Sequence, residues 1–405
     1  MTQNAKLDKN VILAGLTSFF TDVSSEMLYP LIQAFVTMVL AAQKALLGPV
    51  LGIIEGIAES TASLLKVFIG YYSDKFQNRK TPTIIGYALS AVSKGILFFA
   101  STGWPFVLFS RFFDRIGKGM RTAPRDAIIT ESTPEKIRGK AFGFHRAMDF
   151  AGAAVGVLIC YAASLRLMDP VTKTLKDLNA FYFLFVLSIV PAFLGVLFLF
   201  PIREKRISVR QNRNRPQPNL HLGRYDRNLK LFFSAVFLFT LGNSSNQFLL
   251  LRSMSLGHTL PTVILMYMLF NVSTSLLSTF FGSLSDRIGR KRLIVLGHTL
   301  YAVVYMSFGW ISKNTNSLLW VTWILYGVYY ATSEGVEKAL VSDLAPAHSR
   351  ATALGFYHTI VGIGLLPASL IAGFLYSVHP GAPFVFGGTM SLASAGVIVC
   401  FLRSQ

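Results

Sequence analysis

Apolar runs of about twenty residues recur along the whole chain, and this length is what a helix needs to cross the hydrocarbon core of a bilayer. Of the 405 residues, 52% are hydrophobic and only 14% are charged, against roughly 25% charged residues in soluble domains. The pattern predicts an all-α polytopic membrane protein in a lipid bilayer. We place twelve transmembrane helices at 10–40, 46–73, 81–101, 104–131, 135–165, 179–201, 229–252, 258–285, 292–312, 316–343, 349–378 and 383–403.

Lysine and arginine gather in alternate loops between these spans. The loop at 202–230 carries nine basic residues against two acidic ones, whereas the loops at 101–105 and 377–383 are nearly uncharged. Because cytoplasmic loops are enriched in lysine and arginine, we expect the basic loops and both termini on the cytoplasmic side of the inner (plasma) membrane. The net charge of +19 then reflects loop composition, so we expect no nucleic acid partner.

The chain also contains an internal repeat. The segment GYYSDKFQNRK at 70–80 recurs as GSLSDRIGRKR at 282–292, and PEKIRGKAFGFHR at 134–146 recurs as PAHSRATALGFYH at 346–358. Both repeats share an offset of 212 residues, as from Pro134 to Pro346. This offset predicts two pseudo-symmetric six-helix bundles at 1–201 and 229–405, joined by a basic cytoplasmic linker at 202–228.

The second copy of the repeated loop, from Gly282 to Lys291, resembles the loop signature of the major facilitator superfamily. The first copy departs from that signature by one extra residue, and it has Asn78 near the usual glycine. We expect Asn78 to supply the left-handed backbone of the turn, which asparagine tolerates. The resemblance implies the twelve-helix fold and alternating access, in which two bundles rock about a central site. It also implies that the first, fourth, seventh and tenth helices line that site.

Several spans contain charged residues, which cost about 2.5–3.5 kcal/mol each at the bilayer centre and therefore usually mark a pathway or a partner. Asp22 and Glu26 are four residues apart in the first span and share a helix face. The seventh span has neutral asparagines where the first has acids. An alternative is a structural ion pair, such as Asp22 with Arg111. The predicted substrate-binding residues are Asp22, Glu26, Arg111, Arg115, Asn243 and Asn246.

A second group of acidic residues predicts proton coupling. Glu55 and Glu59 share a face of the second span, and Asp149 lies at a similar depth in the fifth. Burial and like charge favour protonated carboxyl groups in such a cluster. The alternative is a cluster neutralised by Arg146 or Arg111. The predicted proton-coupling residues are Glu55, Glu59, Asp149 and Asp22.

The inner ends of the fourth and tenth spans carry exchanged charges. At the 212-residue offset, Arg125 corresponds to Glu337 and Asp126 to Lys338. We expect these opposite charges to hold the cytoplasmic mouth closed, and Pro124 to interrupt the fourth helix. The alternative is pairing within each half: Asp74 with Arg121 or Arg125, and Asp286 with Lys338. The predicted gate residues are Asp74, Arg79, Arg121, Arg125, Asp126, Asp286, Arg290, Glu334, Glu337 and Lys338.

The sequence contains no phosphate loop, no zinc-binding HExxH and no nucleophile elbow. We therefore expect no enzyme, no catalytic residue, no cofactor and no metal. The favoured function is a monomeric secondary active transporter, coupled to protons. Its substrate would be a small anionic or zwitterionic organic solute, such as a carboxylate metabolite or a siderophore. The alternative is a proton-coupled multidrug exporter, in which Asp22, Glu26 and Glu59 receive cationic or amphipathic compounds.

Overall fold

The computed structural model describes residues 7–29, 61–62, 65–167, 179–204, 221–244 and 246–402, and the regular structure in these ranges is helical. The helices of the N-terminal half follow the first six predicted spans. They are α1 (Lys9–Glu26), a helical segment at 65–76, α4 (Lys80–Ser93) continued by the 3-10 helix η2 (Lys94–Thr102), α5 (Trp104–Glu131), η3 (Glu135–Ile137), α6 (Arg138–Leu167) and α7 (Asn179–Leu197).

The C-terminal half continues with the remaining six spans. Short 3-10 turns, η4 (Leu222–Arg224), η5 (Lys313–Thr315) and η6 (Ala347–Ser349), lie in its loops. The main helices are α9 (Arg227–Gly242), α10 (Asn246–Ser255), α11 (Leu260–Ile288), α12 (Arg290–Trp310), α13 (Leu318–Leu344), α14 (Arg350–Val378) and α15 (Ala382–Phe401). The twelve-helix organisation is therefore confirmed.

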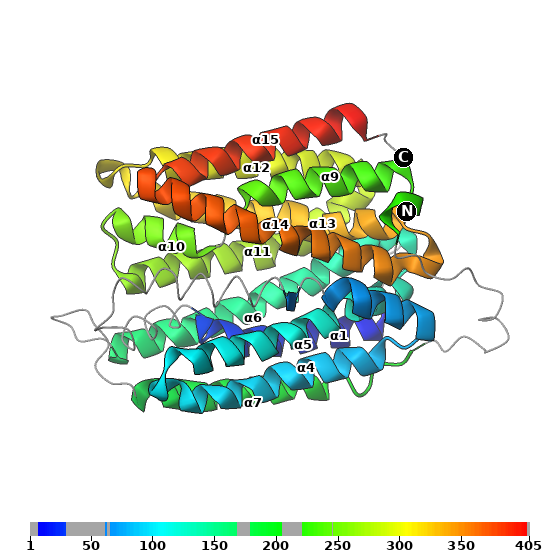
Figure 1. Cartoon of the computed structure of the whole chain (residues 1–405), viewed down its shortest axis with the longest axis horizontal. Coiled ribbons are helices and arrows are strands. Elements are labelled where there is room, and N and C mark those ends of the chain that lie inside the picture. Colours follow the sequence, from blue (N-terminus) through cyan, green and yellow to red (C-terminus); the bar gives the residue numbers. More distant parts are fainter. Residues whose placement is uncertain are drawn as a thin grey trace.

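The helices run along the long axis of the molecule in two layers (Figure 1). The layer containing α1, α4, α5, α6 and α7 lies below the layer containing α9 to α15 in that view. The two layers meet where α6 packs along α11. The loops that precede α4, α6, α12 and α14 lie together at one end, which we call the basic-loop end.

Glycines allow the helices of the two halves to approach closely near the basic-loop end. A Cβ atom on Gly143 of α6 would clash with the carbonyl oxygen of Ser278 on α11. Gly355, its repeat counterpart on α14, meets the carbonyl oxygen of Lys66 in the same way. Because position 66 plus 212 is position 278, the two close contacts are related by the internal repeat.

Two local predictions about helix continuity are wrong. The seventh span is two helices, since α9 ends at Gly242 and α10 begins at Asn246. Asparagine and serine at this break hydrogen-bond locally and are weak helix formers, which explains the interruption. In contrast, α5 continues through Pro124, although proline supplies no backbone N–H. Here the packing of both flanking turns, which are buried, holds the helix together.

The turn in the first loop also differs from its prediction. The left-handed backbone falls on Gln77, with φ of 50°, and not on Asn78. Asn78 instead accepts a hydrogen bond through its side-chain oxygen from the backbone N–H of Thr81, at 3.1 Å. The second copy places Gly289 in the left-handed region, with φ of 93°. The extra residue in the first copy therefore shifts the turn and frees Asn78 to stabilise the start of α4.

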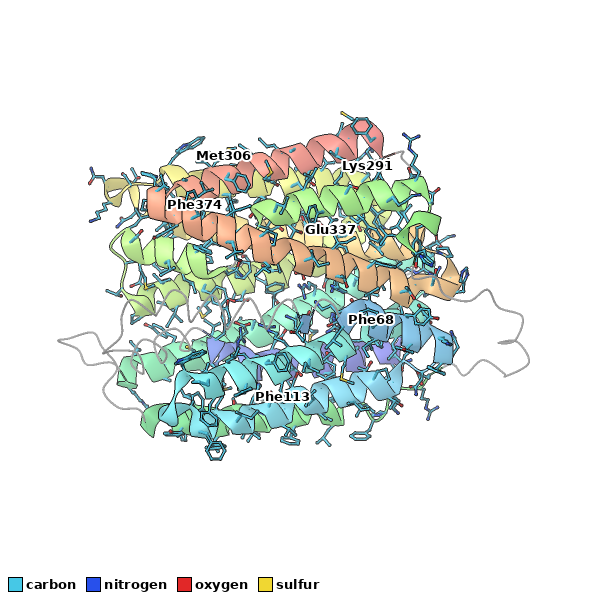
Figure 2. The ribbon with its side chains drawn as sticks, in the orientation of Figure 1. Phe68, Phe113, Lys291, Met306, Glu337 and Phe374 are labelled. Carbon is cyan, nitrogen blue, oxygen red and sulfur yellow. The ribbon has the colours of Figure 1, made fainter. Side chains whose placement is uncertain are left out.

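The outer surface of the helices is apolar. Phe68, Phe113 and Phe374 are 51%, 38% and 70% exposed and point away from the bundle (Figure 2). Among the described residues, six helices are long and apolar enough to cross a membrane. α5 and α13 are long but are not among these six, and both carry charged side chains inward. These exposed phenylalanines suit contact with lipid acyl chains.

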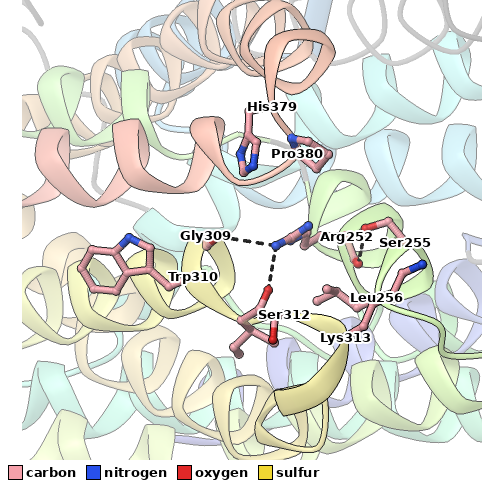
Figure 3. A pocket seen from close by; sticks show the side chains of 10 residues that line it. Arg252, Ser255, Leu256, Gly309, Trp310, Ser312, Lys313, His379 and Pro380 are labelled. Atoms are coloured by element: carbon pink, nitrogen blue, oxygen red, sulfur yellow. Dashed lines mark hydrogen bonds between the residues drawn. The ribbon is translucent and has the colours of Figure 1, made fainter.

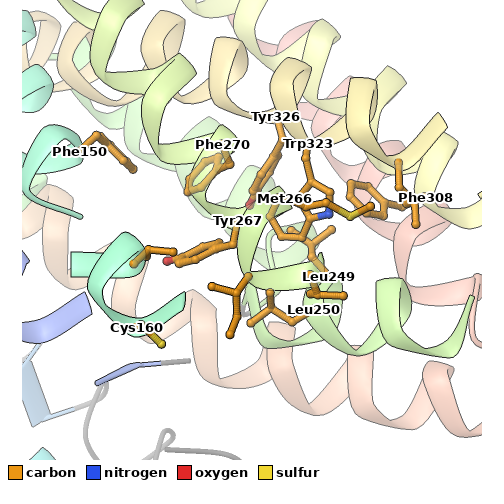
Figure 4. Close-up of a cluster of buried hydrophobic side chains, with 14 of the residues drawn as sticks. Phe150, Cys160, Leu249, Leu250, Met266, Tyr267, Phe270, Phe308, Trp323 and Tyr326 are labelled. Carbon is orange, nitrogen blue, oxygen red and sulfur yellow. The ribbon is translucent and has the colours of Figure 1, made fainter. Parts of the chain in front are cut away.

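An aromatic cluster fills the C-terminal half and reaches the N-terminal half (Figure 4). Phe270 on α11 packs edge-to-face against Phe150 on α6, with ring centroids 5.5 Å apart. On the other side Phe270 stacks on Tyr326 of α13 at 5.1 Å. The cluster thus connects the two halves in the middle of the molecule, where the C-terminal half has few charges.

Candidate functional site: a central charged layer and a duplicated closure

Two aspartates at the basic-loop end cap helices of the opposite half. Asp286, at the end of α11, accepts hydrogen bonds from the backbone N–H groups of Gly139 and Lys140 in α6, at 3.1 and 3.0 Å. Asp74 accepts from the backbone N–H and the hydroxyl of Thr352 in α14, both at 2.7 Å. A carboxylate at a helix N-terminus satisfies free N–H groups and interacts favourably with the helix dipole. The two caps hold the two halves together.

Each capping aspartate is fixed by an arginine from the loop that follows it. Arg79 pairs with Asp74 at 2.6 Å and with Glu131 at 3.0 Å. Arg290 pairs with Asp286 at 2.9 Å and also with Asp343 at the end of α13. Residues 131 and 343 differ by 212, so the network is present once in each half. The alternative pairings of Asp74 with Arg121 or Arg125, and of Asp286 with Lys338, are wrong because these loop arginines occupy the aspartates.

The environment of Asp74 shifts the pKa of its carboxyl group. Burial raises the pKa of Asp74 above the ordinary value, while the Arg79 guanidinium and the hydrogen bonds from Thr352 oppose that change. These partners give the carboxylate the donors that its ionised form requires when it is buried.

Deeper in the molecule, Asp126 of α5 gathers partners from both halves. Its carboxylate lies 2.9 Å from the Arg125 guanidinium, 3.5 Å from Lys338 Nζ of α13 and 3.1 Å from His358 Nε2 of α14. The ion pair of Asp126 with Lys338 connects the fourth and tenth spans, as the exchanged charges suggested. A hydrogen bond between the same helices joins the hydroxyl groups of Thr130 and Ser342, 3.4 Å apart.

The expected contact between Arg125 and Glu337 is wrong. Arg125 donates to Asp126 and, at 3.1 Å, to the hydroxyl of Tyr87, so it stays within its own half. Glu337 accepts a 2.6 Å hydrogen bond from the hydroxyl of Tyr357 and lies 3.1 Å from His298 Nε2. Each charge is therefore satisfied by a local partner that the repeat alone does not reveal.

Glu334 pairs across the halves with a residue of α6. Its carboxylate contacts the guanidinium of Arg146. Arg146 also lies 2.7 Å from Asp149, one turn further along α6. Arg121 packs over the ring of Tyr87, with 4.3 Å between Cζ and the ring centroid. The predicted gate residues are thus brought to one end, although five of them make the contacts described here within their own half. These five are Arg79, Arg121, Arg125, Arg290 and Glu337.

The central charged residues of the N-terminal half lie on α1, η2 and α5. Arg111 is only 9% exposed, and its guanidinium lies 5.4 Å from the ring centroid of Tyr29. Arg115 follows one turn later on α5. Glu26 ends α1, and the positive charges of Lys118, Arg111 and Arg115 act on its carboxyl group. Acidic and basic groups therefore mix in one layer, which we call the central charged layer.

The alternative ion pair of Asp22 with Arg111 is wrong for the structure described. The charged groups around Asp22 are instead Asp149, Glu26, Lys118 and Arg121. Arg111 lies at the level of Tyr29, which is seven residues beyond Asp22, or about 10 Å at 1.5 Å per residue. The depth estimated by counting residues from the loops placed Arg111 too close to the level of Asp22.

The neutral residues of the seventh span lie at the break between α9 and α10. The hydroxyl of Tyr326 donates to the Asn246 side-chain oxygen at 2.8 Å, and Tyr301 donates to the Asn243 side-chain oxygen at 3.3 Å. Glu26 accepts a 3.2 Å hydrogen bond from Tyr267 of α11, so the central charged layer reaches the C-terminal half. The two asparagines therefore belong to a tyrosine-rich surface.

The predicted proton-coupling residues are only partly described by the structure. Asp149 lies between Arg146, at 2.7 Å, and His145, at 3.6 Å. Asp22 lies in the central charged layer, close enough to Asp149 for their charges to interact. Glu55 and Glu59 lie outside the described residues.

The predicted substrate-binding residues left out several charged residues of this layer. Lys94, which is buried on η2, donates to the hydroxyl of Ser24, and Asp114 and Lys118 belong to the same α5 surface. Their position in spans was a usable signal, because few charged residues occur there. Glu131 and Asp343 could have been found from their equal offset of 212. His298 and His358 carried no comparable signal, since each is a lone histidine.

A pocket of about 360 Å³ lies at the opposite end of the C-terminal half, between the ends of α10, α12 and α14 (Figure 3). Arg252 donates through Nε to the Phe308 carbonyl at 3.1 Å and through Nη2 to the Ile311 carbonyl at 2.8 Å. A cation that binds the last carbonyl groups of a helix stabilises its C-terminus. Arg252 therefore joins α10 to the end of α12.

The fold and its paired bundles define a multi-pass membrane transporter. The family model of the major facilitator superfamily matches residues 14–251 and 231–405. The chain belongs to the major facilitator superfamily.

Three similar proteins illustrate this membership. An uncharacterized MFS-type transporter of Methanocaldococcus jannaschii, MJ1317, is 36% identical over 98% of this chain and 96% of its own length. The quinolone resistance protein NorA of Staphylococcus aureus is 28% identical over 34% of this chain and 35% of its own length. The solved structure of the proton:xylose symporter XylE shares the fold, with a TM-score of 0.79 at 17% identity, over 98% of this chain and 96% of that one.

Proposed function

We propose that this transporter moves a small anionic or zwitterionic organic solute across the inner membrane by secondary active transport, coupled to protons. The central charged layer is the observation that carries the proposal. It combines four basic side chains with three acidic ones inside the membrane-spanning part of the chain. These are Lys94, Arg111, Arg115 and Lys118, with Asp22, Glu26 and Asp114.

The composition of this layer links a proton to an anion. With all seven of these described groups ionised, their charges sum to one excess positive charge. A proton on Asp22 or Glu26 raises the excess to two and strengthens the attraction for a carboxylate. Release of that proton weakens the attraction. Since such coupling is reciprocal, the bound anion in turn favours the protonated acid.

The other half supplies hydrogen bonds and aromatic surface. Asn243 and Asn246 present amide groups beside Tyr301 and Tyr326. These groups suit the neutral part of an organic solute, while the basic residues of α5 suit its acidic part. The proposed site therefore lies between the halves, with a charged wall and a neutral wall.

The contacts at the basic-loop end serve, in this proposal, as the cytoplasmic gate. We define the gate as the caps of Asp74 and Asp286 together with the contacts of Asp126, Arg146 and Glu334 between the halves. They join the two halves in the structure described. Alternating access requires them to break when the site opens to the cytoplasm. The proposal includes cytoplasmic termini and function as a monomer.

Export of cationic or amphipathic drugs is the second candidate. It is favoured by the partial similarity to the quinolone resistance protein and by the large aromatic cluster. In that case Asp22 and Glu26 would receive the cation, and the aromatic rings would bind the remainder of the drug.

Ligand-induced thermal stabilisation distinguishes these two candidates. Purified protein is melted with small carboxylates (citrate, gluconate, benzoate) and with cationic amphipaths (ethidium, tetraphenylphosphonium). A ligand at about 100 times its Kd stabilises the native state by roughly 2.7 kcal/mol, which raises Tm by a few degrees. We expect a carboxylate to raise Tm, and Arg111→Gln and Asp22→Asn to reduce that shift. If neither variant changed binding or transport, the central site would be wrong.

A further inference from the structure

We propose that His358 binds a proton from the cytoplasm and thereby regulates the opening of the cytoplasmic gate. This inference rests on the proposed gate and adds a regulatory site to it. His358 does not belong to the residues predicted to couple transport to protons.

The position of His358 allows it to report on the contact between the halves. The side chain lies on α14 and is 8% exposed. Its Nε2 atom lies 3.1 Å from the Asp126 carboxylate on α5, which belongs to the other half. Lys338 Nζ lies 3.5 Å from the same carboxylate oxygen, Oδ2. Any separation of the halves therefore removes Asp126 from the imidazole.

The internal repeat provides a matched contact that does not titrate. The residue 212 positions before His358 is Arg146 on α6, which also reaches across the halves to an acid, Glu334 of α13. A guanidinium keeps its charge at every physiological pH, whereas an imidazole changes charge near neutral pH. The two contacts start from equivalent positions on α6 and α14, although their acidic partners are not equivalent. One contact is permanent and the other depends on pH.

The charges that face His358 determine the direction of this dependence. Lys66 approaches it from the helix at 65–76 and Lys338 from α13, and Asp126 with its neighbour Arg125 approaches from α5. Glu337 of α13 is engaged by His298 and by Tyr357, the residue that precedes His358. Two cations, Arg125 and Lys338, thus lie beside the Asp126 carboxylate, and Lys66 adds a third positive charge that acts on the ring. The neutral imidazole, donating its Nε2–H to Asp126, is the form that fits the closed gate.

A second proton on the ring therefore favours separation of the halves. Opening takes away Lys66, Arg125 and Asp126, which belong to the N-terminal half, and exposes the ring to cytoplasmic water. The exposed imidazole then takes up a proton in the pH range in which a histidine in water does. Because the proton enters and leaves on the cytoplasmic side, it sets the balance between closed and open states and is not itself transported.

The distance between labels across the gate tests this regulation in the full chain. Lys136 and Ala347 are exposed at the basic-loop end of opposite halves, and each is replaced by cysteine and spin-labelled, after Cys160→Ala and Cys400→Ala. We expect the open-to-closed ratio to rise about tenfold from about pH 8 to about pH 5.5, the order expected from one linked proton. In His358→Gln, which keeps a donor for Asp126, we expect a change below about twofold.

Arg146→Gln is the matched control. Loss of the permanent contact should raise the open fraction at every pH and leave the pH response intact. If His358→Gln responds to pH as the wild type does, or if the wild type does not respond, the inference is wrong. His358→Asn replaces His358→Gln if the latter fails to fold. Proton-driven solute flux, measured separately in liposomes, tests the proposed function: its absence beside an intact His358 response would contradict only the proposed coupling.

Discussion

The N-terminal and C-terminal halves make equivalent contacts at the basic-loop end and different ones toward the middle. Asp74 and Asp286 each cap a helix of the opposite half, and each is held by an arginine. The arginines also pair with acids exactly one repeat apart, Glu131 and Asp343. Since both halves need the same closure, both copies kept the same chemistry.

Further from the loops, equivalent positions have diverged. Because the first loop has one extra residue, Tyr87 corresponds to His298, just as Gly86 corresponds to Gly297. Arg125 donates to Tyr87 in one half, and Glu337 lies against His298 in the other. The position on α5 or α13 thus holds a cation in one half and an anion in the other, and its partner on α4 or α12 is a tyrosine or a histidine. The comparison teaches that the two helix caps are symmetric, whereas the charged groups of the proposed substrate and proton site lie in one half.

A disulfide between equivalent positions should have the largest effect. The Thr130 and Ser342 hydroxyls lie 3.4 Å apart on α5 and α13. In Thr130→Cys/Ser342→Cys, with Cys400→Ala, oxidation should fix the halves together and abolish transport, and reductant should restore it. Flux of a carboxylate into proteoliposomes measures this. Normal flux through a fully crosslinked protein would show that α5 and α13 need not separate.

Removal of the shared carboxylate should have the next largest effect. Asp126→Asn leaves Arg125 and Lys338 buried beside a neutral group, which costs about 3–5 kcal/mol for a buried pair. We expect a clear drop in Tm or in refolded yield. Glu135→Gln, at an exposed position, is the control and should melt like the wild type. Equal melting of the two variants would contradict the view that Asp126 is the centre of the inter-half contacts.

The central charged layer should be sensitive to a single charge. Arg111→Gln removes a cation next to Glu26 and should lower carboxylate transport by about 100-fold, as loss of one buried charge-assisted contact does. Arg166→Gln removes an exposed arginine and should leave transport unchanged. Equal transport by the two variants would show that the anion does not bind at Arg111 on α5.

The two helix caps should give the smallest effects, and nearly equal ones. Asp74→Asn weakens the cap of α14 and Asp286→Asn the cap of α6, each by about 1–2 kcal/mol. Spin-label distances across the gate should show similar shifts toward the open state for both variants. If one variant shifted the distances strongly and the other did not, the two caps would not be equivalent, and the comparison of the halves would be wrong.

Much of the fold could be predicted from the sequence, because apolar length and loop charge report directly on the bilayer. The twelve spans follow from these two properties, and the repeat located Asp74 and Asp286 at one end. The break before Asn246 and the continuous helix through Pro124 were not predictable. At Pro124 tertiary packing overrides local propensity. At the break, local hydrogen bonding by asparagine and serine interrupts a span whose apolar length predicted one continuous helix.

The sequence predicted the partners of individual charged residues less well than it predicted the fold. The offset of 212 correctly related Asp126 to Lys338, which form an ion pair. The offset could not show that Arg125 donates a hydrogen bond to Tyr87. The tyrosine hydroxyl is uncharged, so comparing charges between the halves does not identify it as a partner. A residue count placed Arg111 near Asp22, although the structure places it beside Tyr29. Small errors in depth are enough to change which charges meet.

Proton flux in pyranine-loaded proteoliposomes tests the central claim most directly. Citrate, gluconate or benzoate is added outside, and internal acidification is recorded for the wild type, Asp22→Asn and Arg111→Gln. The proposed coupling predicts acidification with at least one carboxylate and its loss in both variants. A change of internal pH only with ethidium or tetraphenylphosphonium, or an unchanged response to the carboxylates in both variants, would contradict it.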